Sequence, residues 1–353
     1  MEIVAEELST RMVNLGHSVT CYNRGGHHVS GAQYDVRSQK EYKGIRLKHV
    51  LTLDAKGLAA VTSSISAAFC SAFSKAKIVH IHAEGPAFMC WLPRLFGKRV
   101  VVTVHGLDWQ REKWKSGFGA RYIRAGEKMA VRYAHEIIVL SRNVQKYFQD
   151  TYGRTVRYIP NGVTRPELRE PEEITKLGLQ KNDYVLFLGR LVPEKGIHYL
   201  VEAFRQLRTD KKLVIAGGSS DTDEYAQKLR QMAAGDDRIV FTGFVQGRLL
   251  EELYSNAYVY VLPSDVEGMP LSLLEAMSYG NCCLVSDIPE CAEVVQEQGV
   301  TFPKGDVDGL RQRLQTLCDD PGRVAAKKSG AADYICGKYD WDEVAKKTLE
   351  LYQ

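Results

Sequence analysis

The chain has 353 residues, more than one hydrophobic core usually organises, so two domains are expected. An apolar fraction of 44% and a charged fraction of 25% are typical of a globular protein, and no apolar run reaches membrane-spanning length. A formal net charge of +4 is too small to indicate a nucleic-acid-binding protein. Eight cysteines without C-x-x-C spacing, and a polar amphipathic start instead of a signal peptide, favour a reduced cytoplasmic location.

In the first half of the chain, apolar residues at helical spacing alternate with short β-branched runs. The expected helices cover residues 2–15, 59–73, 119–134 and 143–151, and the expected strands cover 19–22, 44–50, 78–82, 100–104, 136–140 and 156–159. This alternation predicts a parallel sheet covered on both faces. The stretch 160–181 is rich in proline, glycine and charge, so we expect an inter-domain linker there.

The second half repeats the alternation. Strands are expected at 184–188, 213–216, 239–242, 258–262 and 283–286, with helices from about residues 195, 223, 247, 271 and 290, and closing helices at 306–317, 323–334 and 341–352. The fold class is therefore α/β, with two doubly wound Rossmann-like domains and a ligand cleft between the carboxyl ends of their strands.

The stretch 264–280 is the most informative part of the sequence. After a buried strand, a turn contains Glu267 and Gly268, and Pro270 and Leu271 stand where a helix begins, with Glu275 about one turn inside it. The N–H groups of a helix N-terminus bind phosphate, and two carboxylates so placed can accept hydrogen bonds from two hydroxyl-bearing rings. A nucleotide sugar offers that pattern. The alternative is a solvated loop glutamate and a helix-dipole partner.

A second set of residues follows the neighbouring strands. Gly189 permits close backbone approach after strand 184–188, and Arg190 and Lys195 bring two cations to the same edge. Two fixed cations can neutralise a departing diphosphate without a metal. The alternative is that Arg190 forms a structural ion pair and Lys195 is solvated. Phe244 and Val245 either line a base pocket or belong to the core.

Together these motifs resemble a known enzyme family. The run GRLVPEKG, the later AGG and TGF, EGMPLSLLEAM, and IPNGV at the linker look like the nucleotide-sugar-binding half of the family 4 retaining glycosyltransferases, which have the GT-B fold. The first half, with HIHAEGPAFMCWLPRLFGKRVV and HGLDWQREKW, resembles bacterial transferases that build surface polysaccharide of the cell envelope, some of which transfer rhamnose.

The resemblance implies a role for each donor-side residue. Glu267 would hold hydroxyls of the donor sugar and Glu275 the ribose hydroxyls. Arg190 and Lys195 would neutralise the diphosphate, with help from the backbone amides near residues 270–271.

In the first domain, His105 matches the family's histidine beside the reacting sugar, so His105 and Glu267 are the catalytic candidates. His82, Glu84 and Asp108 end neighbouring strands and are weaker candidates for contact with the acceptor. His80 and His82 alternate in a strand, and we expect them to face opposite sides, which argues against a metal site.

The function expected from the resemblance is transfer of a sugar, with retention, from a nucleotide-sugar donor to a polysaccharide or lipid-linked acceptor (EC 2.4). No D-x-D motif stands in a suitable loop, so no metal and no cofactor beyond the donor substrate are expected. Two rivals remain: a nucleotide-sugar epimerase of the same fold, and a non-catalytic nucleotide-sugar-binding partner. No nucleic-acid partner is expected.

Two stretches, 91–99 and 109–132, mix aromatic side chains with lysine and arginine. Such a face can lie on an anionic membrane and reach a lipid-linked acceptor, which would place the protein peripherally at the inner face of the plasma membrane. A solvated basic helix with internally packed tryptophans explains the same residues equally well.

The expected domains are 1–160 on the acceptor side, 161–336 on the nucleotide-sugar side, and a terminal helix at 337–353 that packs back on the first domain. Family members start with a strand and a glycine-rich loop before the helix that opens this chain. Either the chain as given starts too late or it is a damaged or regulatory relative. We favour an incomplete N-terminus, which would impair activity and leave unpaired backbone groups in the first sheet.

Overall fold

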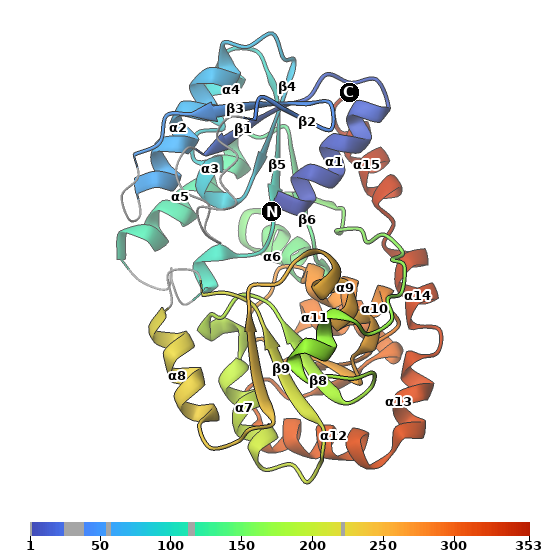
Figure 1. Cartoon of the computed structure of the whole chain (residues 1–353). Coiled ribbons are helices and arrows are strands. Elements are labelled where there is room, and N and C mark those ends of the chain that lie inside the picture. The colour runs from blue at the N-terminus through green and yellow to red at the C-terminus, as the bar shows by residue number, and fades with distance from the viewer. Residues whose placement is uncertain (1, 25–38, 54–57, 112–116, 220–222) are drawn as a thin grey trace. The chain divides into compact units, whose positions relative to one another are not determined.

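The computed structural model describes residues 2–24, 39–53, 58–111, 117–219 and 223–353, and it divides into two compact units (Figure 1). Unit 1 comprises Met1–Asn161 together with Trp341–Gln353, and unit 2 comprises Gly162–Asp340. Each unit has its own β-structure and its own hydrophobic core, which confirms the predicted α/β class with two parallel-sheet domains.

Unit 2 is built on one six-stranded parallel sheet with the order β10-β9-β8-β11-β12-β13. Its strands are β8 Tyr184–Leu188, β9 Lys212–Ala216, β10 Ile239–Gly243, β11 Val259–Leu262, β12 Cys282–Ser286 and β13 Val300–Phe302. Every residue of β11 and β12 is buried, as expected for apolar strands that are covered on both faces. From β8 the chain adds strands first on one side and then, from β11, on the other, so a topological switch point lies between β8 and β11.

Helices surround this sheet. They are α7 Ile197–Arg205, α8 Asp223–Ala233, α9 Gly247–Asn256, α10 Leu271–Ser278, α11 Pro289–Val295, α12 Val307–Asp319, α13 Pro321–Lys328 and α14 Ala331–Lys338, with short 3-10 turns at Glu173–Leu177, Pro193–Lys195 and Gln296–Gln298. The boundary between the units falls at the start of the stretch expected to be a linker, and its residues from Gly162 onward belong to unit 2. The buried carboxylate of Glu252 on α9 accepts hydrogen bonds from the backbone N–H groups of Glu172 and Ile174, which fixes that stretch against α9.

The described residues of unit 1 form two sheets. The larger is parallel, with the order β4-β5-β6-β7, and the smaller has β1 parallel and β2 antiparallel to β3. The strands are β1 Thr20–Arg24, β2 Glu41–Tyr42, β3 Ile45–Val50, β4 Ile78–His82, β5 Arg99–Val104, β6 Glu136–Val139 and β7 Arg157–Tyr158. Among the residues that the structure describes, no strand pairing joins the two sheets.

The helices of unit 1 are α1 Glu2–Asn14, α2 Leu58–Ala72, α3 Glu84–Ala87, α4 Trp91–Leu95, α5 Gly117–Tyr133, α6 Arg142–Tyr152 and α15 Trp341–Glu350. The short helices α3 and α4 and the strand β13 were not predicted, because each is too short to show a period and proline interrupts both helices. Across the described ranges, no helix has the length and apolar character needed to cross a bilayer.

The terminal helix α15 packs against α1 in unit 1. Trp341, at its start, is only 3% exposed, and Arg11 on α1 donates a hydrogen bond to Asp342 at 2.6 Å. Beyond the helix, Arg99 at the start of β5 donates to the carbonyl of Leu351 at 2.7 Å. These contacts tie the end of the chain to the sheet that carries His105.

Candidate functional site

The loop between β11 and α10 has the local structure that the sequence predicts. Glu267 lies in this loop, Pro270 occupies the N-cap position, and Leu271 opens the eight-residue helix α10. Gly268 and Pro270 are buried, and Glu275 lies one turn into the helix. The N-terminus of α10 therefore opens directly after the carboxyl end of β11, beside the switch point of the sheet.

The structure joins two of the predicted residues directly. The Lys195 ammonium donates to Glu267 Oε1 at 2.6 Å, and the side chains are only 15% and 8% exposed. Ser264 donates to the same oxygen at 2.6 Å, a contact that the sequence did not single out. One carboxylate thus links the loop after β8 to the loop after β11. Arg190 lies in the same loop as Lys195 and is exposed to solvent.

The loop after β8 approaches its neighbours so closely that glycine is required. Gly196 has a φ of 65°, and a Cβ on it would lie 2.0 Å from the carbonyl oxygen of Pro263. Gly217, after β9, has a φ of 147°, and its Cβ would lie 1.8 Å from the carbonyl oxygen of Gly189. Any other residue at either position would force the strand-end loops apart.

The Glu275 carboxylate accepts a hydrogen bond from a buried tyrosine. Tyr254, on α9, donates its hydroxyl proton to Glu275 Oε2 at 3.0 Å, and the Tyr254 ring stacks on Tyr279 with centroids 5.2 Å apart. Burial raises the pKa of the Glu275 carboxyl to about 6, and the hydrogen bond from Tyr254 opposes that rise. The carboxyl therefore changes charge just below neutral pH.

The two candidates for a base pocket differ in exposure. Phe244, directly after β10, is 47% exposed, whereas Val245 is 8% exposed and belongs to the core. Gly218 lies close to Phe244, since a Cβ on Gly218 would be 3.7 Å from the Phe244 Cβ. The side chain of Phe244 thus leaves the backbone beside Gly218, which follows β9.

In unit 1, three histidines cluster where β4 and β5 end. His82 Nδ1 and His105 Nε2 lie 3.0 Å apart, and the rings of His80 and His82 stack with centroids 4.4 Å apart. The prediction that His80 and His82 face opposite sides is wrong, because residues two apart in a strand share a face. His80 lies 2.7 Å from the Tyr352 hydroxyl and 2.7 Å from Thr103 Oγ1.

Burial keeps this histidine cluster neutral. It lowers the pKa of His82 to about 4 and holds the pKa values of His80 and His105 well below the ordinary range. A neutral His105 can accept or donate a hydrogen bond at the end of β5, but it offers no fixed positive charge. Among the described residues, no group of three or more His, Cys, Asp or Glu side chains is placed to hold a metal ion.

The structure also places Glu84 next to Asp108, but Glu84 is buried and contacts the backbone of Asp108. Glu84 is fully buried at the start of α3, and its Oε2 accepts a hydrogen bond from the backbone N–H of Asp108 at 2.9 Å. The side chain of Asp108 pairs with Arg111 at 3.0 Å. The sequence missed Glu127, which is 1% exposed on α5 and adjoins Glu84. The only signal was a glutamate on the apolar side of an amphipathic helix.

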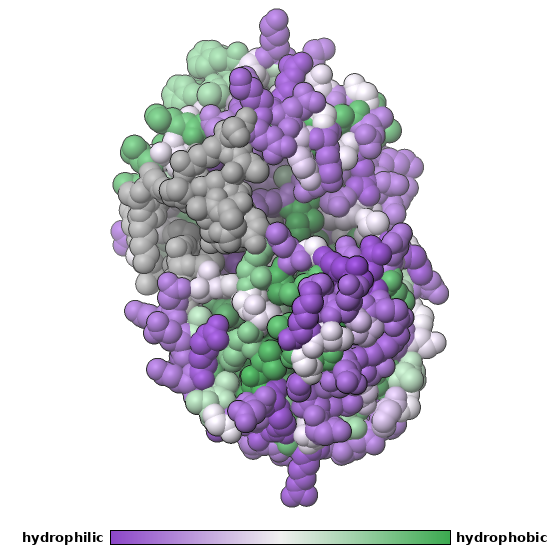
Figure 2. All heavy atoms as spheres, viewed as in Figure 1, coloured by the Kyte–Doolittle hydropathy of each residue, from purple (hydrophilic) through white to green (hydrophobic). Residues whose placement is uncertain are grey.

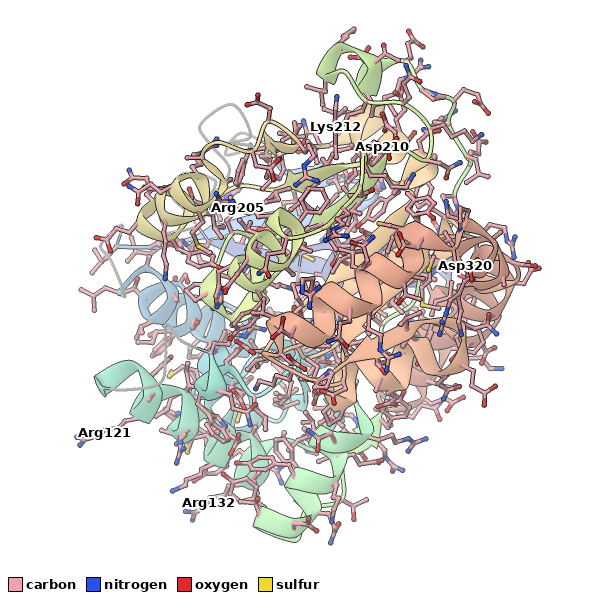
Figure 3. All side chains as sticks on the ribbon, turned by 90° about the horizontal axis from the view of Figure 1, so that it is seen from below. Arg121, Arg132, Arg205, Asp210, Lys212 and Asp320 are labelled. Atoms are coloured by element: carbon pink, nitrogen blue, oxygen red, sulfur yellow. The ribbon has the colours of Figure 1, made fainter. Side chains whose placement is uncertain are left out.

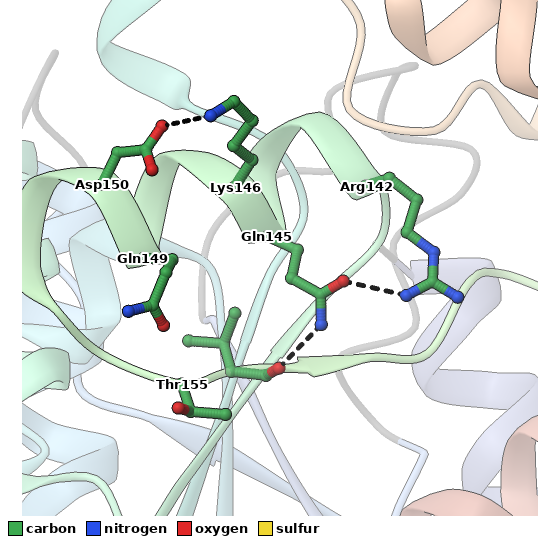
Figure 4. A pocket seen from close by; sticks show the side chains of 7 residues that line it. Arg142, Gln145, Lys146, Gln149, Asp150 and Thr155 are labelled. Atoms are coloured by element: carbon green, nitrogen blue, oxygen red, sulfur yellow. Dashed lines mark hydrogen bonds and ion pairs between the residues drawn. The ribbon is translucent and has the colours of Figure 1, made fainter.

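A shallow pocket of about 300 Å³ lies along α6 (Figure 4), and none of the predicted site residues lines it. It is lined by Arg142, Gln145, Lys146, Gln149, Asp150, Thr155 and Val156. Its polar groups bond to one another: Lys146 pairs with Asp150 at 2.8 Å, and Gln145 bonds to Arg142 at 2.9 Å and to the Val156 carbonyl at 3.0 Å. These contacts occupy four of its polar side chains with one another or with the backbone.

Comparisons with known proteins cover both units. The family profile described as Glycosyltransferase Family 4 matches residues 1–165, and that described as Glycosyl transferases group 1 matches residues 182–320. An uncharacterized glycosyltransferase of Methanocaldococcus jannaschii is 30% identical over 269 residues, which are 72% of this chain and 68% of that protein.

Two solved structures share the fold across most of the chain. Sucrose-phosphate synthase of Thermosynechococcus elongatus has a TM-score of 0.85 at 22% identity, over 99% of this chain and 92% of that one. Anabaena HepE, solved in complex with UDP-glucose, has a TM-score of 0.75 at 19% identity, over 87% of this chain and 86% of that one.

Proposed function

The chain belongs to family 4 of the retaining glycosyltransferases, and we propose that it transfers a hexose from a uridine diphosphate sugar to a polysaccharide or lipid-linked acceptor. Its fold is GT-B and its donor is a nucleotide sugar. UDP-glucose is the first donor to test, since it is the ligand of the Anabaena neighbour. In this proposal unit 2 holds the donor and unit 1 supplies His105 and the acceptor side.

One observation carries the donor assignment. At the switch point of the unit 2 sheet, the loop after β8 and the loop after β11 meet through the Lys195–Glu267 pair, next to the N-terminus of α10. Ligands of open α/β sheets bind at this place, and a helix N-terminus beside two cations suits a diphosphate. Arg190 and Lys195 then stabilise the charge that develops on the leaving diphosphate, in place of a divalent metal.

The two carboxylates divide the remaining donor groups. Glu275, one turn into α10, accepts hydrogen bonds from the ribose hydroxyls, which requires its ionised form. Glu267, already bonded to Lys195 and Ser264 through Oε1, binds hydroxyls of the transferred sugar through its other oxygen. When the diphosphate binds, Lys195 is shared between it and Glu267.

Saturation-transfer NMR against a panel of nucleotide sugars tests this donor site. We expect selective signals from one base and one sugar, lost in Glu275→Ala and kept in Glu202→Ala, which removes an exposed glutamate on α7. Equal signals from Glu275→Ala and the unchanged protein would contradict the assignment of Glu275 to the ribose.

For the acceptor side, we propose contact with an anionic membrane surface inside the cytoplasm. Five exposed side chains on α2, α4 and the turns that follow them form an apolar patch. They are Ile65 (37% exposed), Phe69 (49%), Phe73 (67%), Leu95 (73%) and Phe96 (45%). The ring centroids of Phe73 and Phe96 lie 4.5 Å apart, so the two helices present one continuous patch. Figure 2 shows green hydrophobic atoms gathered at the top left of the view, over α2 and α4.

The charges near the apolar patch favour an anionic surface. Between residues 58 and 99 the basic side chains are Lys75, Lys77, Arg94, Lys98 and Arg99, and the one acidic side chain, Glu84, is buried. The helix α5, which packs on α4, presents four exposed cations on one face: Arg121, Arg124, Lys128 and Arg132. Arg121 and Arg132 point away from α5 in Figure 3. All eight cysteines are free, as is usual in a reducing compartment.

Flotation with vesicles of neutral or anionic phospholipid tests the membrane proposal. We expect binding only to anionic vesicles, weakened by salt and lost in the double variant Phe69→Ser/Phe73→Ser. Leu168→Ser, which removes a leucine that is 68% exposed in unit 2, should leave binding intact. No dependence on anionic lipid, or equal binding by the double variant, would overturn the proposal.

A further inference from the structure

We propose that Glu84 and Glu127 form a carboxylic acid–carboxylate pair that positions the loop carrying His105. Both would be positioning residues for the transfer reaction, since neither is exposed to a substrate. This inference rests on the proposed function only where it concerns turnover. The existence of the pair and its hold on the loop can be tested without any substrate.

The pair is built where α3 and α5 cross closely. Gly126 on α5 lies against α3 so tightly that a Cβ on it would be 1.9 Å from the backbone oxygen of Glu84. Because Glu127 follows Gly126, this close approach brings the Glu127 carboxyl beside the Glu84 carboxyl, where a shared proton can join the two side chains. Glu84 is 0% and Glu127 1% exposed, so no solvent screens them.

The hydrogen bonds show which of the two carries the proton. Glu127 accepts from Trp109 Nε1 at 3.2 Å and from the Tyr147 hydroxyl at 2.9 Å, and also from the Tyr152 hydroxyl. This is the environment of a carboxylate. Within the described part of the chain, Glu84 Oε1 is buried and accepts no hydrogen bond. A proton on Glu84 Oε1 converts that orphan oxygen into a donor to Glu127 and leaves the pair with one negative charge.

Other charged and titratable groups around the pair agree with this assignment. Burial, and then the hydrogen bond with Glu127, raise the pKa of Glu84 to about 10. Asp108 is a nearby negative charge that raises it further, and the Asp108 side chain is neutralised by Arg111. Among the described residues, Tyr147 and Tyr152 donate to Glu127, Tyr122 lies beside Gly85, and Arg124 lies 4.5 Å from the Trp109 ring centroid.

The two carboxyl groups hold two consecutive residues of one loop. Glu84 Oε2 binds the backbone N–H of Asp108 at 2.9 Å, and Glu127 Oε2 binds the side chain of Trp109. His105 begins this loop directly after β5. The pair therefore holds the loop through one backbone group and one side chain. Ionisation of Glu84 would place two adjacent negative charges next to this loop.

The experiment compares Glu84→Gln with Glu84→Leu. The glutamine can still accept from Asp108 and donate to Glu127, whereas leucine can do neither. We expect Glu84→Leu to lower kcat at least tenfold with the donor Kd unchanged, because the donor residues lie in unit 2. Glu84→Gln should restore most of kcat and keep it near pH 10, where the unchanged enzyme loses activity as Glu84 ionises.

A ¹³C-carboxyl NMR titration of Glu84 provides the substrate-free readout. We expect a pKa near 10, together with amide protection of Asp108 that persists in Glu84→Gln and disappears in Glu84→Leu. A Glu84 pKa in the ordinary range near 4.5, or unchanged kcat and protection in Glu84→Leu, would overturn the proposal. If Glu84→Leu does not fold, the titration and the alkaline behaviour of Glu84→Gln still decide it. Absence of donor binding by the unchanged protein would instead count against the proposed function.

Discussion

The hydrogen bond from Tyr254 to Glu275 gives the sharpest prediction for the donor site. In the proposed donor site, Glu275 accepts hydrogen bonds from the two ribose hydroxyls best when it is ionised. Burial raises the pKa of its carboxyl to about 6, so donor binding should weaken as pH falls through 6. Tyr254→Phe removes a hydrogen bond of 3.0 Å to the charged form. The Tyr254 hydroxyl also lies 3.3 Å from the Ser272 carbonyl, so we take the lower end of the range for such bonds, about 1.5 kcal/mol.

That loss raises the pKa of Glu275 by about one unit, because one unit corresponds to about 1.4 kcal/mol. The ionised fraction at pH 6 then falls about fivefold, whereas at pH 8 it changes by only about a tenth. Isothermal titration with UDP-glucose from pH 6 to 8 should therefore show a defect in Tyr254→Phe that grows as the pH is lowered. The matched control is Tyr258→Phe, whose hydroxyl donates to the Leu317 carbonyl at 2.7 Å. An affinity ratio between Tyr254→Phe and the unchanged protein that stays constant across this pH range would refute the reasoning.

Two further predictions concern the loop after β8. Lys195→Ala should weaken UDP binding by about 10- to 100-fold, as expected for loss of a charge-assisted hydrogen bond. It should also destabilise unit 2, because the carboxylate of Glu267 loses its cation. An unchanged Kd in calorimetry would argue against a role of Lys195 at the diphosphate. Gly196→Ala should lower the free energy of unfolding in urea by about 2–3 kcal/mol, because the new Cβ would collide with the Pro263 carbonyl. The control Gly153→Ala, at a similar φ of 61° but with nothing within 4 Å of its Cβ, should lower it by only about 1 kcal/mol. Equal losses of unfolding free energy would show that the close approach does not matter.

Local patterns in the sequence were sufficient to predict the stretch from β11 to α10 in unit 2. Each element there has a sequence signal contained within about ten residues, so its structure was predicted. These elements are the strand before Pro263, the turn around Glu267 and the helix after Pro270. The Lys195–Glu267 pair was not predicted, because it joins residues 72 positions apart whose loops meet only when β8 and β11 pair.

The contacts inside unit 1 were harder to predict. Apart from its place on the apolar side of an amphipathic helix, nothing in the local sequence distinguishes Glu127 from a solvent-exposed glutamate on a helix. Its position beside Glu84 results from the packing of α3 on α5, which the sequence does not predict. The misplacement of His80 relative to His82 had a different cause. The prediction placed residues two apart in a strand on opposite faces, whereas such residues share a face. The stacked rings of His80 and His82 show this directly.

Turnover of the bound donor tests the central claim most directly. The measurement is release of UDP from UDP-glucose, or from whichever nucleotide sugar binds, with water or simple glycosides as acceptors, by the unchanged protein and by His105→Ala. The proposed transferase activity predicts nucleotide release with a product that keeps the donor's anomeric configuration, and a His105→Ala protein that binds the donor equally but releases far less. Donor binding in both proteins, with no release above the His105→Ala level, would contradict catalysis and leave a nucleotide-sugar-binding protein.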